Sequence, residues 1–568
     1  MEKRALAAIG LSILVLLSFR YFEERRMKEI AKSRPPAQRQ VPASQTVLPP
    51  AASAPAAATT TPVEQPQAAA AGPSFDTHAT AQKVVVEGSI YRAELDNRGA
   101  LLVSWHLNKY RSGNKAEFEM IAANHMQETR PFPGALIFDD PNLTTLANSE
   151  LYDVEIQGNE AGKTEYTPPA TVSMKLRRGD LLIEKTYHFL RENYLVDFSV
   201  KVVRAGQHVP GRILLGQDIG PEYEHLLNPS AQLQAIYNLD GKVKRDTPPK
   251  DENPVRKGEG NIRWAGLDMQ YFAIIAIAGQ TLPEIELQKR PVKTTGLDQK
   301  EVTRDLLRLT LPSSGKSMFQ IYLGPKKQDL LDAVKGADLS GVIDYGMFWF
   351  LVRPLLASLV WIHQYVRNWG IAIVLLTLLL TLLLFPFRLK QIISMKKMAV
   401  VQPKIKEIQE KYKRYKKTDP KRAEMNQEIM AIYKAHNVNP LGGCLPLLLQ
   451  MPLLFAFYSL LAYSIELRQA PFFGWIQDLA QKDPYYVLPI IMGVTMLISQ
   501  KMTPMTPGTD PTQAKMMMLM PVIFTVMFFN VSSGLNLYFL CSNIFQIGFQ
   551  KVAERWVSDK RPASKPRQ

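Results

Sequence analysis

The chain has little cysteine and no recognisable catalytic motif. Two cysteines in 568 residues cannot cross-link a fold of this size, which excludes a disulfide-rich secreted scaffold. The GxxxxGK[ST], HExxH and GxSxG patterns are all absent, and the eight histidines have no metal-ligand spacing. The residues therefore predict no enzyme: no catalytic residue, no metal site and no cofactor.

Charge is missing from one long segment. No Asp, Glu, Lys or Arg occurs between Lys515 and Lys551, which an ordinary soluble domain does not tolerate. The positive excess is equally localised: residues 388–440 hold 14 Lys and Arg against 5 Asp and Glu, and residues 551–568 hold 6 against 2. Basic blocks beside apolar spans are typical of cytoplasmic segments. The chain is therefore predicted to be a multi-pass membrane protein.

The N-terminal part is predicted to be an anchor followed by a linker. An apolar run, Ala5–Phe19, is followed by a charged, aromatic segment instead of the small residues of a cleavage site. We interpret residues 1–22 as an uncleaved anchor with a cytoplasmic N-terminus; a removed signal sequence is the alternative. Residues 23–81 are rich in Pro and Ala and predict an unfolded linker.

Residues 82–328 predict an all-β domain outside the cytoplasm. The run Leu181–Val203 alternates apolar and polar residues with period two, and Lys83–Ala93, Tyr271–Ala278 and Met318–Leu323 have similar patterns. Gly, Pro and Asn turns separate these runs. A β-sandwich is the favoured architecture, and the domain contains no cysteine.

The C-terminal half predicts one interfacial helix and five spans. Residues 342–367 combine aromatic with polar residues, which suits an amphipathic helix lying in the membrane interface. Within residues 369–550, the expected spans are Trp369–Phe387, Leu441–Ile465, Tyr485–Gln500, Met516–Asn530 and Leu535–Gln550. With the anchor there are six spans, so both termini are cytoplasmic. Three spans are short and are expected to thin the bilayer.

Polar residues recur inside the expected spans. At 100° per residue, Thr381 lies about 40° and Arg388 about 20° round the helix from Thr377, so the three share one stripe. Other spans contribute Gln450, Asn536, Tyr538 and Asn543. Two interpretations stay open: hydrogen bonds that hold a bundle together, or a wet groove that faces the cytoplasm.

Residues 388–440 predict an antiparallel helical hairpin with a basic exterior. Its helices flank Thr418-Asp419-Pro420, and each has an apolar edge. The basic residues around the turn are Lys411, Lys413, Arg414, Lys416, Lys417, Lys421 and Arg422. They suggest a docking surface for ribosomal RNA, for anionic lipid headgroups, or for both. The alternative is charge that only sets topology. Residues 551–568 add a basic cytoplasmic tail.

Several segments resemble the YidC membrane protein insertase family. They are VNPLGGCLPLLLQMP (438–452), the stretch 466–502, MPVIFTVMFFNVSSGLNLYFLCSN (520–543) and DYGMFWFLVRPLL (344–356). RWAGLDMQYFA (263–273) is similar to the family's periplasmic domain. The resemblance implies the Gram-negative form: a six-span inner-membrane protein with a five-helix insertase core and a periplasmic β-supersandwich. It also implies a chaperone that inserts nascent membrane proteins without ATP, alone or with the Sec translocon and its accessory subunits.

The resemblance also assigns residues. Substrate helices are expected to contact Met451 and Pro452 on one span, Phe524 and Phe528 on another, and Phe539 on the last.

Many members of the family carry a basic residue in a hydrophilic groove, at the position that Thr381 occupies here. Because Thr381 is uncharged, we hypothesise that Arg388 supplies this charge from the cytoplasmic mouth of the groove.

Two functions from other classes remain as alternatives. A small-solute transporter or channel would use the polar stripe as its pathway, but no internal repeat is detected. A membrane-tethered carbohydrate-binding or mutarotase-like protein would need a Glu/His pair in the β-domain, where His106, His125, His188 and Glu224 are the candidates.

Overall fold

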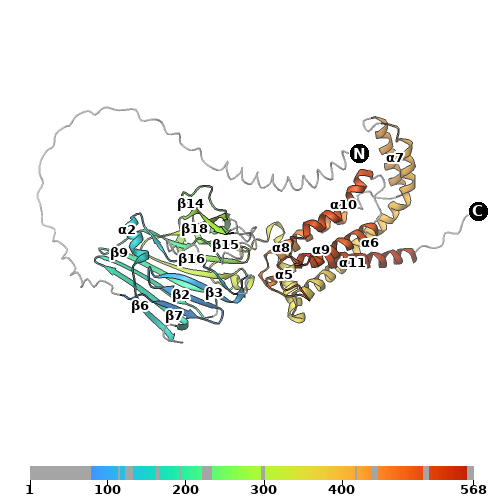
Figure 1. Ribbon diagram of the computed structural model, residues 1–568. Coiled ribbons are helices and arrows are strands. Elements are labelled where there is room, and N and C mark those ends of the chain that lie inside the picture. Colours follow the sequence, from blue (N-terminus) through green and yellow to red (C-terminus); the bar gives the residue numbers. More distant parts are fainter. Residues whose placement is uncertain are drawn as a thin grey trace, which may run out of the picture. The chain divides into compact units, whose positions relative to one another are not determined.

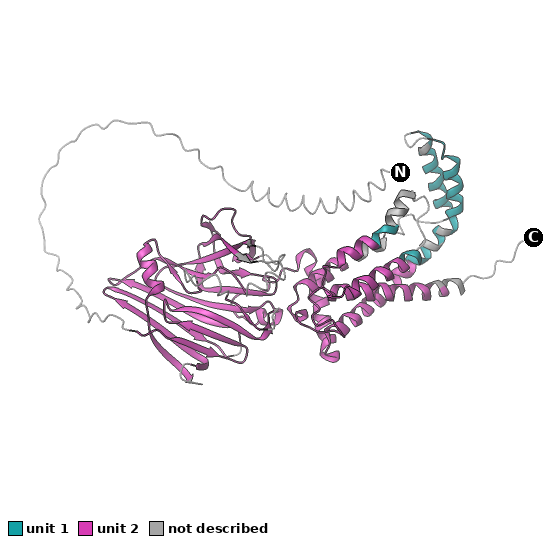
Figure 2. Ribbon diagram, in the orientation of Figure 1, with its two compact units in different colours: residues 1–71, 391–443, 500–521 teal, residues 72–390, 444–499, 522–568 magenta. Residues whose placement is uncertain are grey.

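The computed structural model describes residues 79–559, except 113–115, 122–131, 161–164, 192, 221–232, 296–300, 416–418, 437–444 and 503–510. The expected anchor and nearly all of the linker lie outside these residues. The chain divides into two compact units (Figure 2). The described residues of the first lie within 391–436 and 500–521, apart from the gaps at 416–418 and 503–510, and the second contains the β-domain and most of the apolar helices.

The β-domain is built on a large sheet of fourteen strands (Figure 1). Its strands are β1 (Lys83–Glu87), β2 (Tyr91–Asp96), β3 (Leu101–Arg111), β4 (Glu117–Glu119), β6 (Asp153–Glu160), β7 (Glu165–Arg178), β8 (Leu181–Phe189), β9 (Leu195–Arg204), β10 (Gln207–His208), β12 (Gln234–Leu239), β13 (Lys242–Asp246), β15 (Ile262–Asp268), β16 (Phe272–Leu282) and β19 (Lys316–Pro325). Pairing is antiparallel except between β1 and β7. The main path runs β13-β12-β15-β16-β19-β9-β8-β7-β1-β2-β3-β4.

A second sheet has five strands in the order β14-β17-β18-β11-β5. These are β14 (Val255–Lys257), β17 (Ile285–Thr295), β18 (Glu301–Ser313), β11 (Gly211–Gly216) and β5 (Leu136–Ile137). The two sheets approach closely, because a β-carbon at Gly216 of β11 would lie 3.2 Å from Leu267 Cδ1 of β15. The short helices α2 (Pro141–Ser149) and α4 (Gln328–Asp332) also belong to the domain.

Strand β8 shows how the alternating pattern becomes a core. Its odd-numbered residues are buried and its even-numbered residues are half-exposed, as expected for a strand with one face on the core. The buried set includes the fully buried Lys185. Lys185 Nζ donates to the backbone oxygens of Gly99 (2.6 Å) and Gly134 (2.8 Å), so the amine is satisfied without a carboxylate.

The second unit also contains apolar helices. They are η1 (Gly346–Phe348), α5 (Trp349–Val366), α6 (Trp369–Lys411), α8 (Leu445–Tyr463), η3 (Ile465–Leu467), α9 (Val487–Met502), α10 (Pro511–Phe528) and α11 (Ser533–Asp559). Parts of three of these, α6, α9 and α10, belong to the first unit. Among the described residues, Gly346–Val366 and Trp369–Ser394 are long and apolar enough to cross a membrane. Met451–Tyr463, Val487–Met502 and Met518–Phe528 are shorter apolar helices. The expected count of six spans is therefore not established.

Helix α6 extends well beyond the span that was expected to end at Phe387. It continues without a break to Lys411, although Pro386 lies within it. The proline removes one backbone donor, but the helix runs through it.

In the first unit, the part of α6 beyond residue 390 faces α7 (Lys421–Ala435). Met398, Val401, Ile405 and Tyr433 form a small buried cluster between the two helices. Glu428 Oε1 accepts from Lys411 Nζ (3.0 Å) and from the Tyr412 hydroxyl (2.9 Å). This is a helical hairpin of the kind that the sequence indicates.

The end of α8 and the loop that follows it form hydrogen bonds with the β-domain. Gln469 pairs with the backbone of Arg111 at the end of β3: its Oε1 accepts from the Arg111 N–H (3.2 Å) and its Nε2 donates to the Arg111 oxygen (2.6 Å). Gln270 Nε2 donates to the Ala462 oxygen at the end of α8 (2.7 Å). Two side-chain amides, Gln469 in the loop and Gln270 in the β-domain, therefore connect the β-domain to the loop and to the end of α8.

Candidate functional site

Polar side chains are buried among the apolar helices of the second unit. Thr377 and Thr381 of α6, and Asn536 and Tyr538 of α11, are all buried. Burying polar groups in an apolar bundle is costly unless they find partners. Their hydrogen bonds therefore decide what each of them can do.

The two threonine hydroxyls are satisfied within their own helix. Thr377 Oγ1 donates to the Ile373 oxygen and Thr381 Oγ1 donates to the Thr377 oxygen, each at 2.7 Å. Neither bond reaches another helix, so these hydroxyls do not hold the bundle together. Each oxygen keeps lone pairs that can accept a hydrogen bond from another group.

The amide nitrogen of Asn536 forms hydrogen bonds with the backbone between α10 and α11. Its Nδ2 donates to the oxygens of Phe528 (3.2 Å) and Val531 (3.1 Å), where α10 ends and the turn into α11 begins. A third, longer contact of 3.4 Å reaches the Ser532 oxygen. The Asn536 side chain therefore caps one helix from the next and fixes the α10–α11 turn.

Tyr538 connects three helices. Its ring stacks on Phe457 of α8 with centroids 4.1 Å apart and an interplanar angle of 12°. The charge of Arg388, which is half-buried on α6, acts on the Tyr538 hydroxyl. The Arg388 guanidinium of α6 and the Tyr538 hydroxyl of α11 are thus close enough for their charges to interact.

The expected substrate-contact residues lie on α8, α10 and α11. Phe528 is buried and packs edge-on against Phe539 (4.9 Å between centroids), with Phe524 6.2 Å from Phe528. Met451 and Pro452 of α8 are half-buried. Phe528 therefore supports the contact surface from inside. Helix α10 also carries exposed apolar residues that sequence reasoning did not select: Val522, Ile523, Val526 and Met527.

The remaining groove candidates are less well defined. Asn543 of α11 is half-buried, and the side chain of Gln450 lies outside the described residues, although its backbone belongs to α8. Ser499, Ser542 and Gln550 are also buried. Serine is common enough in helices that composition alone did not single out these residues.

The basic hairpin presents some of its expected cations to solvent. Lys413 and Arg414 are exposed, whereas Lys411 is engaged with Glu428. Lys421 and Arg414 both lie over the ring of Tyr415, at 4.8 Å and 5.3 Å from its centroid. Lys416, Lys417 and the side chain of Arg422 lie outside the described residues.

One Glu/His pair does form in the β-domain. His106 Nε2 lies 3.2 Å from Glu119 Oε2. The other oxygen of Glu119 accepts from the backbone N–H groups of Trp105 (2.8 Å) and Ile121 (2.9 Å), so this carboxylate fixes the β3–β4 connection. Of the other candidates, His188 bonds Thr171 (2.8 Å), and His125 and Glu224 lie outside the described residues. A structural role accounts for each described contact.

A large β-domain joined to apolar helices with buried polar side chains is typical of an integral membrane protein with an extramembranous domain. Comparison with known proteins agrees. The family model described as 60Kd inner membrane protein matches residues 361–560, and the model described as YidC periplasmic domain matches residues 83–358.

Curated relatives match nearly the full length. The membrane protein insertase YidC of Syntrophus aciditrophicus is 35% identical over 97% of this chain and 99% of its own. That of Geotalea uraniireducens is 33% identical over 97% and 98%. A solved structure titled "Active YidC insertase crystal structure with the first transmembrane domain resolved" covers 84% of this chain and 94% of its own, at 18% identity and a TM-score of 0.35.

The chain therefore belongs to the YidC membrane protein insertase family. The family resemblance seen in the sequence is confirmed, as are an inner-membrane location and a β-rich periplasmic domain. Its relatives are insertases and not enzymes, which agrees with the prediction that the chain has no catalytic activity.

Proposed function

We propose that this member of the insertase family passes the polar part of a nascent membrane protein along a hydrophilic groove lined by α6, α8 and α11. One observation carries the proposal: buried Thr381 and half-buried Arg388 of α6, and buried Tyr538 of α11, are polar side chains set among apolar helices. Thr377 and Thr381 add acceptor lone pairs on α6. Asn543 and Gln450 extend the polar lining.

Such a groove lowers the barrier to insertion by hydration. An unsatisfied polar group costs several kcal/mol in hydrocarbon, so a polar substrate segment cannot cross unaided. The groove supplies hydrogen-bond partners for part of the way, and Arg388 attracts acidic substrate residues. The substrate's apolar helix then leaves for lipid. The driving force is its own transfer free energy, and ATP is not needed.

Helix length supports the same mechanism. Helix α9 has 16 residues, which at a rise of about 1.5 Å span roughly 24 Å, less than a hydrocarbon core of about 30 Å. A short span draws the bilayer thinner around it. The polar segment therefore crosses a shorter distance.

The topology that we propose has six spans, with the N-terminal anchor as the first and both termini in the cytoplasm. Helix α5 lies along the periplasmic surface, although it is long enough to cross. Its exposed Trp349, Trp361 and Tyr365 favour the interface, where amphipathic aromatic rings are stable. Both basic segments then face the cytoplasm.

We propose that the hairpin and the C-terminal tail dock partners there. Exposed Lys413 and Arg414 suit ribosomal RNA or anionic lipid headgroups. The Sec translocon and its accessory subunits are the other partners that membership of the family suggests. Nascent membrane proteins are the substrates.

Site-specific photo-crosslinking tests the path. Probes replace Met451 and Phe539, and a matched control replaces Ile490, an exposed apolar residue of α9. Stalled ribosomes carrying a single-span membrane protein serve as bait. Adducts at Met451 and Phe539 that exceed those at Ile490 support the path; equal yields at all three positions would reflect mere proximity in the membrane and overturn it.

A further inference from the structure

The segment between α4 and η1 has no helix or strand, yet most of its apolar side chains are buried. Residues 333–345 connect α4 to η1, and loops of this kind usually run over the surface. Here six of its apolar residues are buried: Val334, Ala337, Leu339, Val342, Ile343 and Tyr345. The connection is therefore packed into the core, so a shift at one of its ends would move the other end.

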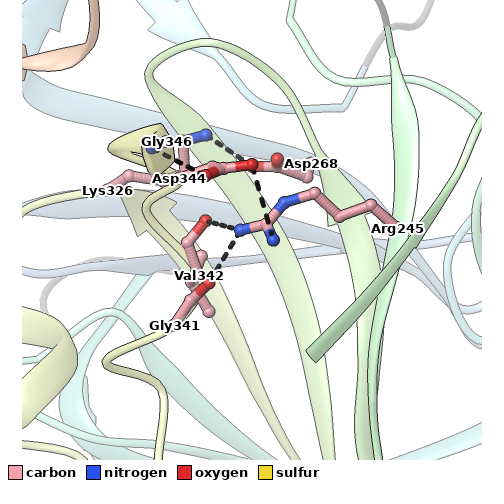
Figure 3. Close-up of polar contacts among 7 residues, drawn as sticks. All are labelled: Arg245, Asp268, Lys326, Gly341, Val342, Asp344 and Gly346. Carbon is pink, nitrogen blue, oxygen red and sulfur yellow. Dashed lines mark hydrogen bonds and ion pairs between the residues drawn. The ribbon is translucent and has the colours of Figure 1, made fainter. Parts of the chain in front are cut away.

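One arginine holds the end of this segment (Figure 3). Arg245 of β13 donates through Nη2 to the oxygens of Gly341 (2.7 Å) and Val342 (3.1 Å), and its Nη1 lies 3.8 Å from Asp344 Oδ2. The other oxygen of Asp344 accepts from the N–H of Gly346, the first residue of η1 (2.9 Å). A single guanidinium thus ties the start of the helical region to a strand that is about 100 residues earlier in the sequence.

A second ion pair lies next to the contacts of Arg245. Asp268 Oδ1 and Lys326 Nζ are 2.6 Å apart, and both side chains are almost fully buried. The charges of Arg245 and Asp344 also act on the Asp268 carboxylate. Two cations and two carboxylates therefore balance within one cluster, and charge-assisted bonds of this kind are the stronger ones in proteins.

The contacts continue from η1 to the proposed substrate path. Phe348 stacks on Phe455 of α8, with centroids 5.9 Å apart and planes within 7°. Helix α5 packs along α8, and its buried residues are Val352, Leu355, Leu356, Leu359 and Ile362. Helix α8 in turn carries Phe457, which stacks on Tyr538.

We infer that Arg245 is a positioning residue: it fixes η1, the turn that leads into α5, against the β-domain and so sets the place of α8 beside α11. The inference rests on the proposed path along these helices. Gln270 holds the other end of α8 through the Ala462 oxygen. The periplasmic domain thereby acts as a rigid frame for the helix that meets the substrate.

The test compares Arg245→Gln with Lys244→Gln in the full-length protein reconstituted into vesicles. Lys244 is exposed on the same strand, so its variant removes the same charge and leaves the clamp intact. Hydrogen exchange at residues 346–350 should rise roughly ten-fold in Arg245→Gln, because charge-assisted bonds are lost, with β12 and β15 unchanged. Crosslinking from Met451 and insertion of a single-span substrate should fall together, and Arg245→Lys should restore part of both.

Asp344→Asn is the second variant. Its amide oxygen can still accept from Gly346, and its side chain is largely exposed, so the sheet is not disturbed. It should loosen residues 346–350 in the same direction, and the double variant should show less than the sum of the two effects.

Unchanged exchange at residues 346–350 would overturn the clamp. Faster exchange with insertion at the parental rate would overturn the positioning role and leave the proposed function intact. A parental protein that does not crosslink at Met451 or Phe539 would instead count against the proposed path itself.

Discussion

Lys185 makes the stability of the β-domain depend on pH. Burial lowers the pKa of this lysine from 10.5 to about 7. Between these values the unfolded chain holds a proton that the folded domain does not, so the free energy of unfolding rises with pH by about 1.4 kcal/mol per unit. Below pH 7 the lysine is charged in both states, and burying this charge lowers the free energy of unfolding by about 5 kcal/mol, which corresponds to the pKa difference of 3.5.

Lys185→Met removes the titration. Its free energy of unfolding should lose this slope between pH 7.5 and 9.5, while Lys83→Met, which changes an exposed lysine, should keep the parental slope. The assay is urea unfolding of the full-length protein in micelles. It follows the fluorescence of buried Trp105 and Trp264 after the other five tryptophans are replaced by phenylalanine. A parental slope in Lys185→Met would mean that the folded lysine is charged, and would refute the reasoning.

Three further changes test the helical region. Arg388→Ala should slow insertion of a substrate with an acidic tail roughly five-fold, as measured by protease protection in vesicles. Lys390→Ala, which removes an exposed charge, should not; equal rates in both variants would remove Arg388 from the site. Asn536→Ala leaves helix-terminal carbonyls unpaired and should lower the free energy of unfolding by about 1–3 kcal/mol in detergent titrations, whereas an unchanged midpoint would show that water replaces the cap. At Gly493 a β-carbon would overlap Thr525 Oγ1, so Gly493→Ala should lower the thermal midpoint, and adding Thr525→Ala should recover part of it; no recovery would place the strain elsewhere.

The strands were predictable where one periodic pattern decides the local structure. The pattern over Leu181–Val203 corresponds to β8 and β9, but the break between them at residues 190–194 depends on a turn that periodicity does not register. The predicted strand Lys83–Ala93 is likewise two strands, β1 and β2, which separate at Gly88. The alternating pattern places Lys185 on the inward face of β8. It does not reveal the hydrogen-bond partners of this lysine, which are backbone carbonyls from distant turns.

The site was predictable as far as a single helix determines it. Thr377 and Thr381 lie on one face because helical geometry alone puts them there. Whether Asn536 faces a groove or caps a neighbouring helix depends on how α10 ends, which no local pattern encodes. Arg245 was missed for the same reason: its partners are about 100 residues away, and a single arginine on a strand looks like any solvated charge.

The amide of Gln469 also closes the end of a β-strand. Its two hydrogen bonds to the Arg111 backbone reproduce the donor–acceptor pair that another strand would offer. An open strand end is a template for edge-to-edge association with another chain. By occupying this position with its own loop, the protein gives the backbone donor and acceptor of Arg111 partners from within the same chain.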